Sequence, residues 1–232
     1  KLSLLKTLRE LTGETYTRLK ELFYTPEQEP ERERVKGTLK YPGGLGPLLP
    51  MHRKYLEERG FRVSYLEEEW GLKGIGIEPH LGYRIWIPVK GRISQRIESW
   101  TTRSVTREAR ARYINAPVTH ESTPLKSLLH GSEKANNLVV VFEGPFSAMR
   151  YGVGGTATCG VGWTKEQALL ISKFPVRVIA LDSEKYAQIR ARRLCALLAP
   201  LPGETYNMVV ETGKAFDDCG KEEIELIKRR FS

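Results

Sequence analysis

Short apolar runs alternate with amphipathic segments in the second half of the chain. Residues 138–142 and 176–181 are the clearest runs, and residues 208–211 form a third. Apolar runs of this length are typical of strands that are buried on both faces of a parallel sheet. Residues 154–158 predict a further short strand or a tight loop.

The segments that separate these runs predict helices. We expect helices over residues 146–150, 189–198 and 221–230, and another that runs through Ile171. Thr164 and Gln167 have the spacing of a capping box, which marks where that last helix begins. Strands that alternate with helices in this way predict an α/β fold, in which helices cover both faces of a parallel sheet.

The first half of the chain is organised differently. Leucine and aromatic residues recur at roughly helical spacing over residues 3–24, with a break near Gly13, which predicts one or two amphipathic helices. Residues 25–50 are rich in Pro, Gly, Glu and Arg, which predicts a linker or an extended arm. A short helix is expected over residues 51–59, ended by Gly60.

A β-hairpin is predicted after that helix. Large apolar residues alternate with others over residues 83–89, Lys90 and Gly91 supply a turn, and residues 92–100 return as a second strand. We therefore divide the chain into three parts. These are a helical segment with a Pro/Glu/Arg-rich linker or arm (1–50), a basic mixed α+β subdomain (51–135) and the parallel-sheet domain (136–232).

The chain carries a strong positive charge. Its 37 Lys and Arg residues outnumber 28 Asp and Glu residues, which gives a formal net charge of +9. Because such a field attracts polyanions, a nucleic acid or nucleotide partner is favoured. No apolar run reaches the length of a membrane span and no signal peptide opens the sequence, so we expect a cytoplasmic protein without membrane contact. The first residue is Lys1 rather than Met, so we expect a processed chain or an excised fragment.

The three cysteines, Cys159, Cys195 and Cys219, are far apart in the sequence. Their spacing fits neither a zinc ribbon nor a disulfide framework. We therefore expect reduced, structural thiols and no zinc within this chain.

Basic residues are dense between Arg84 and Arg112, and three aromatic residues interleave with them: Trp86, Trp100 and Tyr113. An excess of one sign beside aromatic rings is typical of grooves that track a nucleic acid backbone and stack its bases. The alternative is a solvated surface, which is the usual fate of a charged run. The candidate contacts in and around this stretch are Arg84, Arg96, Arg103, Arg112 and Tyr113.

Acidic residues follow the apolar runs. Glu143 comes directly after the first run, and Asp182 and Glu184 come after the second. Ligands of open α/β sheets collect beyond the carboxyl ends of the strands, and Mg²⁺ prefers oxygen ligands. Asp217 and Asp218, further along, are candidates for a second ion or for outer contacts. Glu143 is a candidate ligand or general base, against the simpler alternative that each acid only ends a strand or caps a helix.

Several of these motifs resemble one family. Residues 139–148, with Glu143 followed by Gly144, look like the first motif of the TOPRIM domain. Residues 180–184 resemble its second motif, normally Asp-x-Asp, and residues 213–218 are similar to the Gly-Lys-Asp-Pro-Asp stretch of TOPRIM primases. Upstream stretches extend the likeness to the basic subdomain of bacterial and phage-type DNA primases, so that it covers residues 51–232. Those stretches are residues 84–89, 97–103 and 112–117.

The resemblance implies a TOPRIM domain over residues 136–232 and primer synthesis with Mg²⁺ or Mn²⁺. It implies that Glu143, Asp182 and Glu184 are catalytic and bind metal, and that Asp217 and Asp218 assist. Three more residues, Asn115, Lys126 and Lys214, join the candidates for contacts to template or nucleotide phosphates. The full set is Arg84, Arg96, Arg103, Arg112, Tyr113, Asn115, Lys126 and Lys214.

The implied partners are a single-stranded DNA template, nucleoside triphosphates and a replicative helicase. A zinc-binding module would lie upstream or in a separate chain, and the setting would be the nucleoid or a phage replication site in a host cell. Two alternatives stay open. One is a TOPRIM nuclease or topoisomerase-like enzyme, and the other is a non-catalytic replication module that binds single-stranded DNA.

Overall fold

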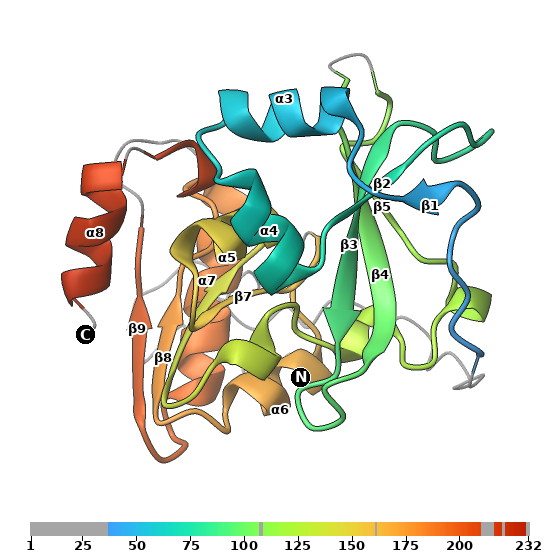
Figure 1. Cartoon of the computed structure of the whole chain (residues 1–232). Coiled ribbons are helices and arrows are strands. Elements are labelled where there is room, and N and C mark those ends of the chain that lie inside the picture. The colour runs from blue at the N-terminus through green and yellow to red at the C-terminus, as the bar shows by residue number, and fades with distance from the viewer. Residues whose placement is uncertain (1–36, 107–108, 161, 210–215, 220, 231–232) are drawn as a thin grey trace. The chain divides into compact units, whose positions relative to one another are not determined.

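Two sheets of different kinds form the framework of the computed structural model (Figure 1). The structure describes residues 37–106, 109–160, 162–209, 216–219 and 221–230. The predicted helices at residues 3–24 and most of the predicted linker lie outside the described residues. All elements below belong to one compact unit, Lys36–Ser232.

The first sheet is antiparallel and contains five strands in chain order. Its central pair is the predicted hairpin, which the structure confirms, although residues 91–96 make a longer connection than the predicted two-residue turn. The pairing places Trp86 opposite Thr102 and Trp100 opposite Pro88. The strands are β1 (Leu45–Gly46), β2 (Lys73–Ile75), β3 (Arg84–Lys90), β4 (Ile97–Ser104) and β5 (Tyr113–Asn115).

Two helices, α3 (Pro50–Glu58) and α4 (Val63–Trp70), precede the hairpin. Helix α3 is the predicted short helix, and Gly60 just after it has φ +72°, a conformation that glycine adopts without steric cost. Helix α4 was not predicted, since the β-hairpin was expected to follow the helix at residues 51–59. Three glutamates on α4 obscure its apolar stripe, which is formed by Val63, Leu66 and Trp70.

The second sheet is parallel, with strand order β7-β6-β8-β9. It confirms the predicted α/β fold, and β6 (Leu138–Phe142) has the predicted bounds. The other strands are β7 (Gly155–Ala157), β8 (Val176–Ile179) and β9 (Glu204–Asn207). Residues 210 and 211 of the strand predicted at 208–211 lie outside the described residues, and residues 208 and 209 are not in a strand. Strand β9 comes earlier and is largely exposed, so its sequence lacks the apolar pattern that marked the other strands.

Helices cover both faces of the parallel sheet, as predicted. Val139 and Val141 of β6 pack against α6 and α7, whereas Val140 and Phe142 point to the opposite face, toward α5 and α8. This alternation follows from the two-residue period of a strand. The capping box at Thr164 and Gln167 is present, with both reciprocal hydrogen bonds at 3.2 Å. The helices are α5 (Pro145–Tyr151), α6 (Lys165–Ile171), α7 (Lys185–Leu198) and α8 (Lys221–Arg230).

A shared core joins the two sheets. Phe146 and Met149 of α5 pack with Leu56, Leu66 and Ile85 from the antiparallel side. Short 3₁₀ turns bridge the remaining segments, and among the described residues no helix is long and apolar enough to cross a membrane. The turns are η1 (Val118–His120), η2 (Leu125–Ser127), η3 (Ser132–Lys134) and η4 (Phe216–Asp218).

Candidate active site

A polar pocket of about 70 Å³ lies where α3, β4 and β5 meet the carboxyl edge of the parallel sheet. It brings together guanidinium groups from the antiparallel side and carboxylates from the parallel side. Three cations and two acids in one small space favour a ligand with phosphate groups and a metal ion. The lining residues are Arg59, Arg103, Arg112, Tyr113, Gly144, Ser147, Asp182 and Asp217.

Glu143 follows β6 directly and is half-buried. Its Oε1 atom is buried and has no hydrogen-bond partner among the described residues. Burial raises the pKa of Glu143 to about 7, the carboxylates of Asp182 and Glu184 add to the rise, and Arg190 and Lys126 oppose it. A buried carboxylate oxygen without a partner is costly, so this position suits a cation or a transferable proton.

Asp182 lies three residues after the end of β8, at the same edge of the sheet. Burial raises its pKa, and the carboxylates of Asp217 and Glu184 raise it further against the opposing charge of Arg112. Its backbone carbonyl accepts a hydrogen bond of 2.9 Å from Gln188 on α7, which fixes the loop. Glu184 is exposed at the N-terminus of α7, so it lies at the rim rather than inside the pocket.

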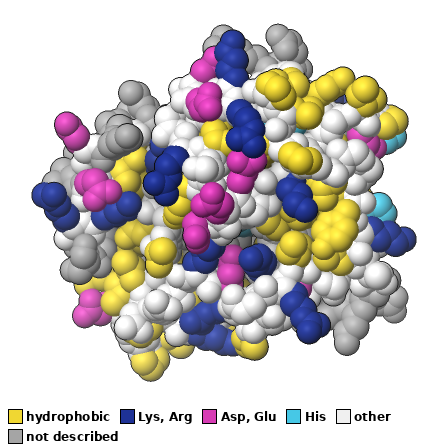
Figure 2. Space-filling view, viewed as in Figure 1, with side chains coloured by type: hydrophobic (Ala, Val, Ile, Leu, Met, Phe, Trp, Pro, Cys, Tyr) yellow, Lys and Arg dark blue, Asp and Glu magenta, His cyan; other side chains and the backbone are white. Residues whose placement is uncertain are grey.

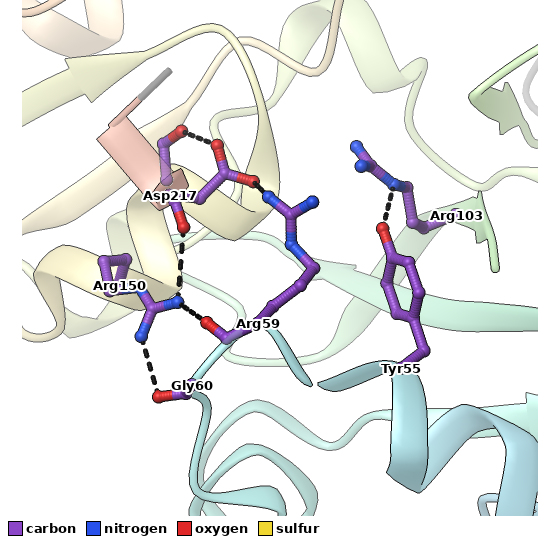
Figure 3. Close-up of polar contacts among 7 residues, drawn as sticks. Tyr55, Arg59, Gly60, Arg103, Arg150 and Asp217 are labelled. Carbon is purple, nitrogen blue, oxygen red and sulfur yellow. Dashed lines mark hydrogen bonds and ion pairs between the residues drawn. The ribbon is translucent and has the colours of Figure 1, made fainter. Parts of the chain in front are cut away.

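Asp217 lies in η4 and has a different environment (Figure 3). Its Oδ2 atom accepts a hydrogen bond of 2.5 Å from Arg59, and its Oδ1 atom accepts one of 3.1 Å from Ser147. The side chain is 9% exposed. Asp217 is therefore neutralised and satisfied by protein partners, unlike Glu143.

Arg150 of α5 fastens the same corner. Its guanidinium donates to the carbonyls of Arg59, Gly60 and Asp217 (Figure 3). The Cζ atom of Arg150 also lies 3.7 Å from the centroid of the Phe61 ring. These contacts hold the turn between α3 and α4 against the end of the parallel-sheet domain.

Arg103 and Tyr113 form the opposite wall of the pocket. Arg103 donates a hydrogen bond of 3.0 Å to the hydroxyl of Tyr55 (Figure 3) and lies 4.9 Å from the centroid of the Tyr113 ring. Burial raises the pKa of Tyr113 to about 12, while Arg103 opposes the rise. The Tyr113 hydroxyl thus stays protonated at neutral pH. Arg112, next in the chain, is exposed at the pocket mouth.

Lys126 lies on the Glu143 side of the site. Its ammonium group donates to the carbonyls of Thr158 and Gly162 at 3.3 Å each, and its charge lowers the pKa of Glu143. Arg190 of α7 acts on Glu143 in the same direction. The two cations flank the carboxylate without entering the pocket of Arg59 and Arg103.

Other predicted contacts lie elsewhere. Arg84 is buried, 6% exposed, and donates to Thr102 and to the carbonyls of Ala111 and Arg112, so it supports the sheet. Arg96 is exposed in the β3–β4 connection, at the opposite end of β4 from Arg103, roughly 20 Å away along a strand of this length. Asn115 is exposed and accepts a hydrogen bond of 2.8 Å from Thr101.

The expectation that Trp86 and Trp100 stack with bases is contradicted by their burial, since each is 1% exposed. They fill the core on one face of the antiparallel sheet with Ile75 and Ala116. Lys214 and the side chain of Asp218 lie outside the described residues.

Sequence reasoning missed Arg59, Ser147 and Arg150. Arg59 and Asp217 are 158 residues apart in the chain, and no local pattern pairs them. Ser147 and Arg150 lie on α5, about one and two helical turns after Glu143. Their closeness to the predicted motif is the sequence feature that could have indicated them.

The acids suit a hard divalent cation. Glu143 offers a carboxylate oxygen that has no hydrogen-bond partner among the described residues, and Asp182 lies near enough for their charges to interact. Within the described residues, no group of three His, Cys, Asp or Glu side chains could hold a metal ion. Since Mg²⁺ commonly uses one or two carboxylates with water and substrate phosphates, two acids are sufficient.

Charges on the face seen in Figure 2 are mixed rather than uniformly positive. Lys and Arg side chains alternate with Asp and Glu across the middle of this face (Figure 2). The net charge of +9 is thus not gathered into one basic patch on this face.

No family model and no curated protein matches the sequence. Solved structures do match. The chain is similar to the DnaG catalytic core, with a TM-score of 0.61 and 19% identity, over 79% of this chain and 74% of that one. It is similar to the RNA polymerase domain of the Mycobacterium tuberculosis primase DnaG, with a TM-score of 0.63 and 19% identity, over 78% and 77%.

A third match comes from a phage. The primase fragment of the bacteriophage T7 primase-helicase protein has a TM-score of 0.54 and 12% identity, over 86% of this chain and 83% of that fragment. The chain therefore has the fold of DNA primase catalytic cores, which confirms the fold that the sequence motifs implied.

Proposed function

We propose that the chain is the catalytic core of a DNA primase, which makes short RNA primers on single-stranded DNA by metal-dependent nucleotidyl transfer. The observation that carries the proposal is the pairing of Glu143 and Asp182 with a pocket of guanidinium groups, on a fold shared with primase cores. Acids alone would suit many metal enzymes, and guanidinium groups alone would suit any anion. Together they suit phosphoryl chemistry.

The reaction joins a 3′-hydroxyl to the α-phosphate of a nucleoside triphosphate, and pyrophosphate leaves. Arg103 and Arg112 bind phosphate oxygens and orient the triphosphate, while Tyr113 limits the space beside Gly144. Positioning and charge neutralisation supply most of the acceleration in such transfers.

Glu143 and Asp182 would hold Mg²⁺ or Mn²⁺, with Glu184 at the rim. When bound, the metal neutralises the phosphate charge and lowers the pKa of a coordinated oxygen. The unpartnered Oε1 of Glu143 supports this role. Because the pKa of Glu143 is about 7, this carboxylate is also able to take a proton near neutral pH.

The proposed partners are a single-stranded DNA template and nucleoside triphosphates. A replicative helicase is proposed because one structural neighbour is the primase fragment of a primase-helicase protein. A zinc-binding module, upstream or in a separate chain, is proposed for template selection from the resemblance to bacterial and phage-type primases. A cytoplasmic setting follows from the same proposal.

The test is incorporation of labelled ribonucleotides on single-stranded DNA with Mg²⁺ or Mn²⁺. Three single-site variants are compared with the unmodified chain: Glu143→Gln, Asp182→Asn and Glu166→Gln. Glu166 is an exposed acid on α6 and serves as the matched control. We expect short products from the unmodified chain and the control, and none from the two site variants.

Two other outcomes point to other functions. Cleavage of the DNA, lost in the same two variants, would favour the nuclease or topoisomerase-like alternative. DNA binding without products, even with a zinc-bearing fragment and a helicase added, would favour the non-catalytic module. That module is the second candidate because Glu184, the second acid of the Asp182–Glu184 motif, is exposed at the rim of the pocket.

A further inference from the structure

Asp217 has the features of an anchor rather than of a metal ligand. Its two carboxylate oxygens accept hydrogen bonds from Arg59 and Ser147, and its backbone carbonyl accepts one of 3.2 Å from Arg150. The residue is 7% exposed. A metal ion would have to displace a guanidinium group from a nearly buried ion pair, which is strongly unfavourable.

Arg59 is held from both ends. Its guanidinium donates a hydrogen bond to Asp217, and its backbone carbonyl accepts one from Arg150 (Figure 3). Arg150 also donates a hydrogen bond of 2.9 Å to the carbonyl of Gly60. Its guanidinium lines the pocket with Arg103 and Arg112. The segment that carries Arg59 belongs to the antiparallel side, so its place in the pocket depends on contacts with the parallel-sheet domain.

We infer that Asp217 is a positioning acid, which holds the guanidinium of Arg59 in the pocket so that Arg59 contacts a phosphate group of the substrate. The phosphate belongs either to a nucleoside triphosphate or to the DNA backbone, and the chemistry of recognition is the same for both. The identity of this substrate rests on the proposed function. Asp217 contributes through Arg59, and the metal ligands are other acids.

The geometry explains why such an anchor is useful. A free arginine side chain loses rotamer freedom when it grips a phosphate, and a side chain that is already fixed loses less. An acid that only repelled phosphate would weaken binding instead. The two effects have opposite signs, so measurement separates them.

The experiment uses the full chain and four variants: Asp217→Asn, Arg59→Ala, their double variant and Asp182→Asn. Manganese binding is measured by electron paramagnetic resonance. Binding of GTP, guanosine and a thymidine 12-mer is measured by calorimetry in the presence of Mn²⁺. Arg192→Ala, which removes an exposed arginine of α7, is the charge control, and thermal unfolding checks each fold.

We expect Asp217→Asn to keep its Mn²⁺ affinity within about twofold, whereas Asp182→Asn loses at least about tenfold. Asp217→Asn and Arg59→Ala should each weaken GTP or the 12-mer by about five- to tenfold, with guanosine unchanged. The double variant should bind no more weakly than Arg59→Ala, because Asp217 acts through Arg59. The polyanion that responds identifies the source of the phosphate.

Several results would overturn the inference. One is a loss of Mn²⁺ affinity in Asp217→Asn that is as large as in Asp182→Asn. Others are tighter binding of GTP or the 12-mer by Asp217→Asn, or weaker binding by the double variant than by Arg59→Ala. The last is unchanged binding of both GTP and the 12-mer in Asp217→Asn and Arg59→Ala. Because none of these measurements needs primer synthesis, a chain that gives the expected pattern but makes no primers would refute only the proposed function. A chain that makes primers but fails this pattern would refute only the role of Asp217.

Discussion

Glu143 and Asp217 are two acids near one edge of one sheet, yet their surroundings differ in kind. Glu143 has a buried oxygen without a partner among the described residues, and burial with neighbouring carboxylates raises its pKa to about 7. Asp217 is less exposed than Glu143, but the guanidinium of Arg59 and the hydroxyl of Ser147 donate hydrogen bonds to its two carboxylate oxygens. Sequence motifs single out both acids, whereas only their neighbours distinguish a site for a cation from an anchor.

The difference follows from which segment approaches each acid. The turn after α3 brings Arg59 to within 2.5 Å of Asp217. Glu143 is approached by Asp182 and Glu184, whose charges oppose its ionisation, and by Lys126 and Arg190, which compensate only in part. Unbalanced charge of this sort is costly in a folded protein and is typical of functional sites.

The largest expected effect is on activity. Glu143→Gln should lower the rate of primer synthesis by about 10²–10³-fold, because it removes a group that contacts metal or proton in the transfer. Asp217→Asn should lower it by about tenfold or less, because it loosens only the placement of Arg59. Rates at nucleotide concentrations well below KM measure both. Equal losses in the two variants would erase the distinction between the acids.

The second effect is on the free energy of unfolding, and here we expect Asp217 to matter more than Glu143. Asp217→Ala leaves Arg59 and Ser147 without their acceptor, and should lower the free energy of unfolding by about 2 kcal/mol, since Arg59 is partly exposed. Glu143→Gln should not lower it. Urea unfolding followed by tryptophan fluorescence measures both, with Glu166→Gln as control. A destabilisation by Glu143→Gln as large as that by Asp217→Ala would contradict the comparison.

Local patterns were enough to predict most of the parallel-sheet domain. The bounds of β6 and the capping box of α6 follow from interactions within a few residues. Strand β9 was missed because its largely exposed sequence lacks an apolar pattern, and helix α4 was missed because three glutamates obscure its apolar stripe. The carboxyl-edge rule found Glu143 and Asp182, since strand ends of a parallel sheet lie together.

The cationic half of the site was less predictable. A run of basic residues does not indicate which of its side chains are buried. Arg84 is buried and donates a hydrogen bond to the carbonyl of Arg112. Arg59 joins Asp217 across 158 residues, a contact that depends on how the two sheets pack. Charge density thus predicted the kind of ligand, whereas the individual contacts required the fold.

The third effect is a pH dependence of stability. In the folded chain the pKa of Glu143 is about 7, against an ordinary value of 4.5. Between these values the folded state binds more protons than the unfolded state, so this residue stabilises the fold below about pH 4.5 and that contribution is lost as pH rises to 7. The Glu143→Gln variant lacks this pH-dependent contribution to stability. Its stability relative to the unmodified chain should therefore increase from pH 5 to pH 8, by about 1–2 kcal/mol for a half-buried group.

Urea unfolding at several pH values measures that difference. Asp182, whose pKa is also raised, interacts with Glu143, so the difference reports the titration of the pair. A flat difference for Glu143→Gln across this pH range would mean that the carboxylate is already compensated.

The smallest effect is stabilisation by the metal. At pH 8, Mg²⁺ at about five times its Kd should stabilise the unmodified chain by about 1 kcal/mol, which is roughly 2–4 °C in Tm for a chain of this size. Asp217→Asn should respond to the same extent, because Asp217 is bound by Arg59 and Ser147. Glu143→Gln should respond less, since it lacks the carboxylate whose Oε1 has no protein partner among the described residues. Thermal unfolding with Mg²⁺, and again after EDTA, measures the shift. A response that is lost in Asp217→Asn and kept in Glu143→Gln would exchange the roles of the two acids.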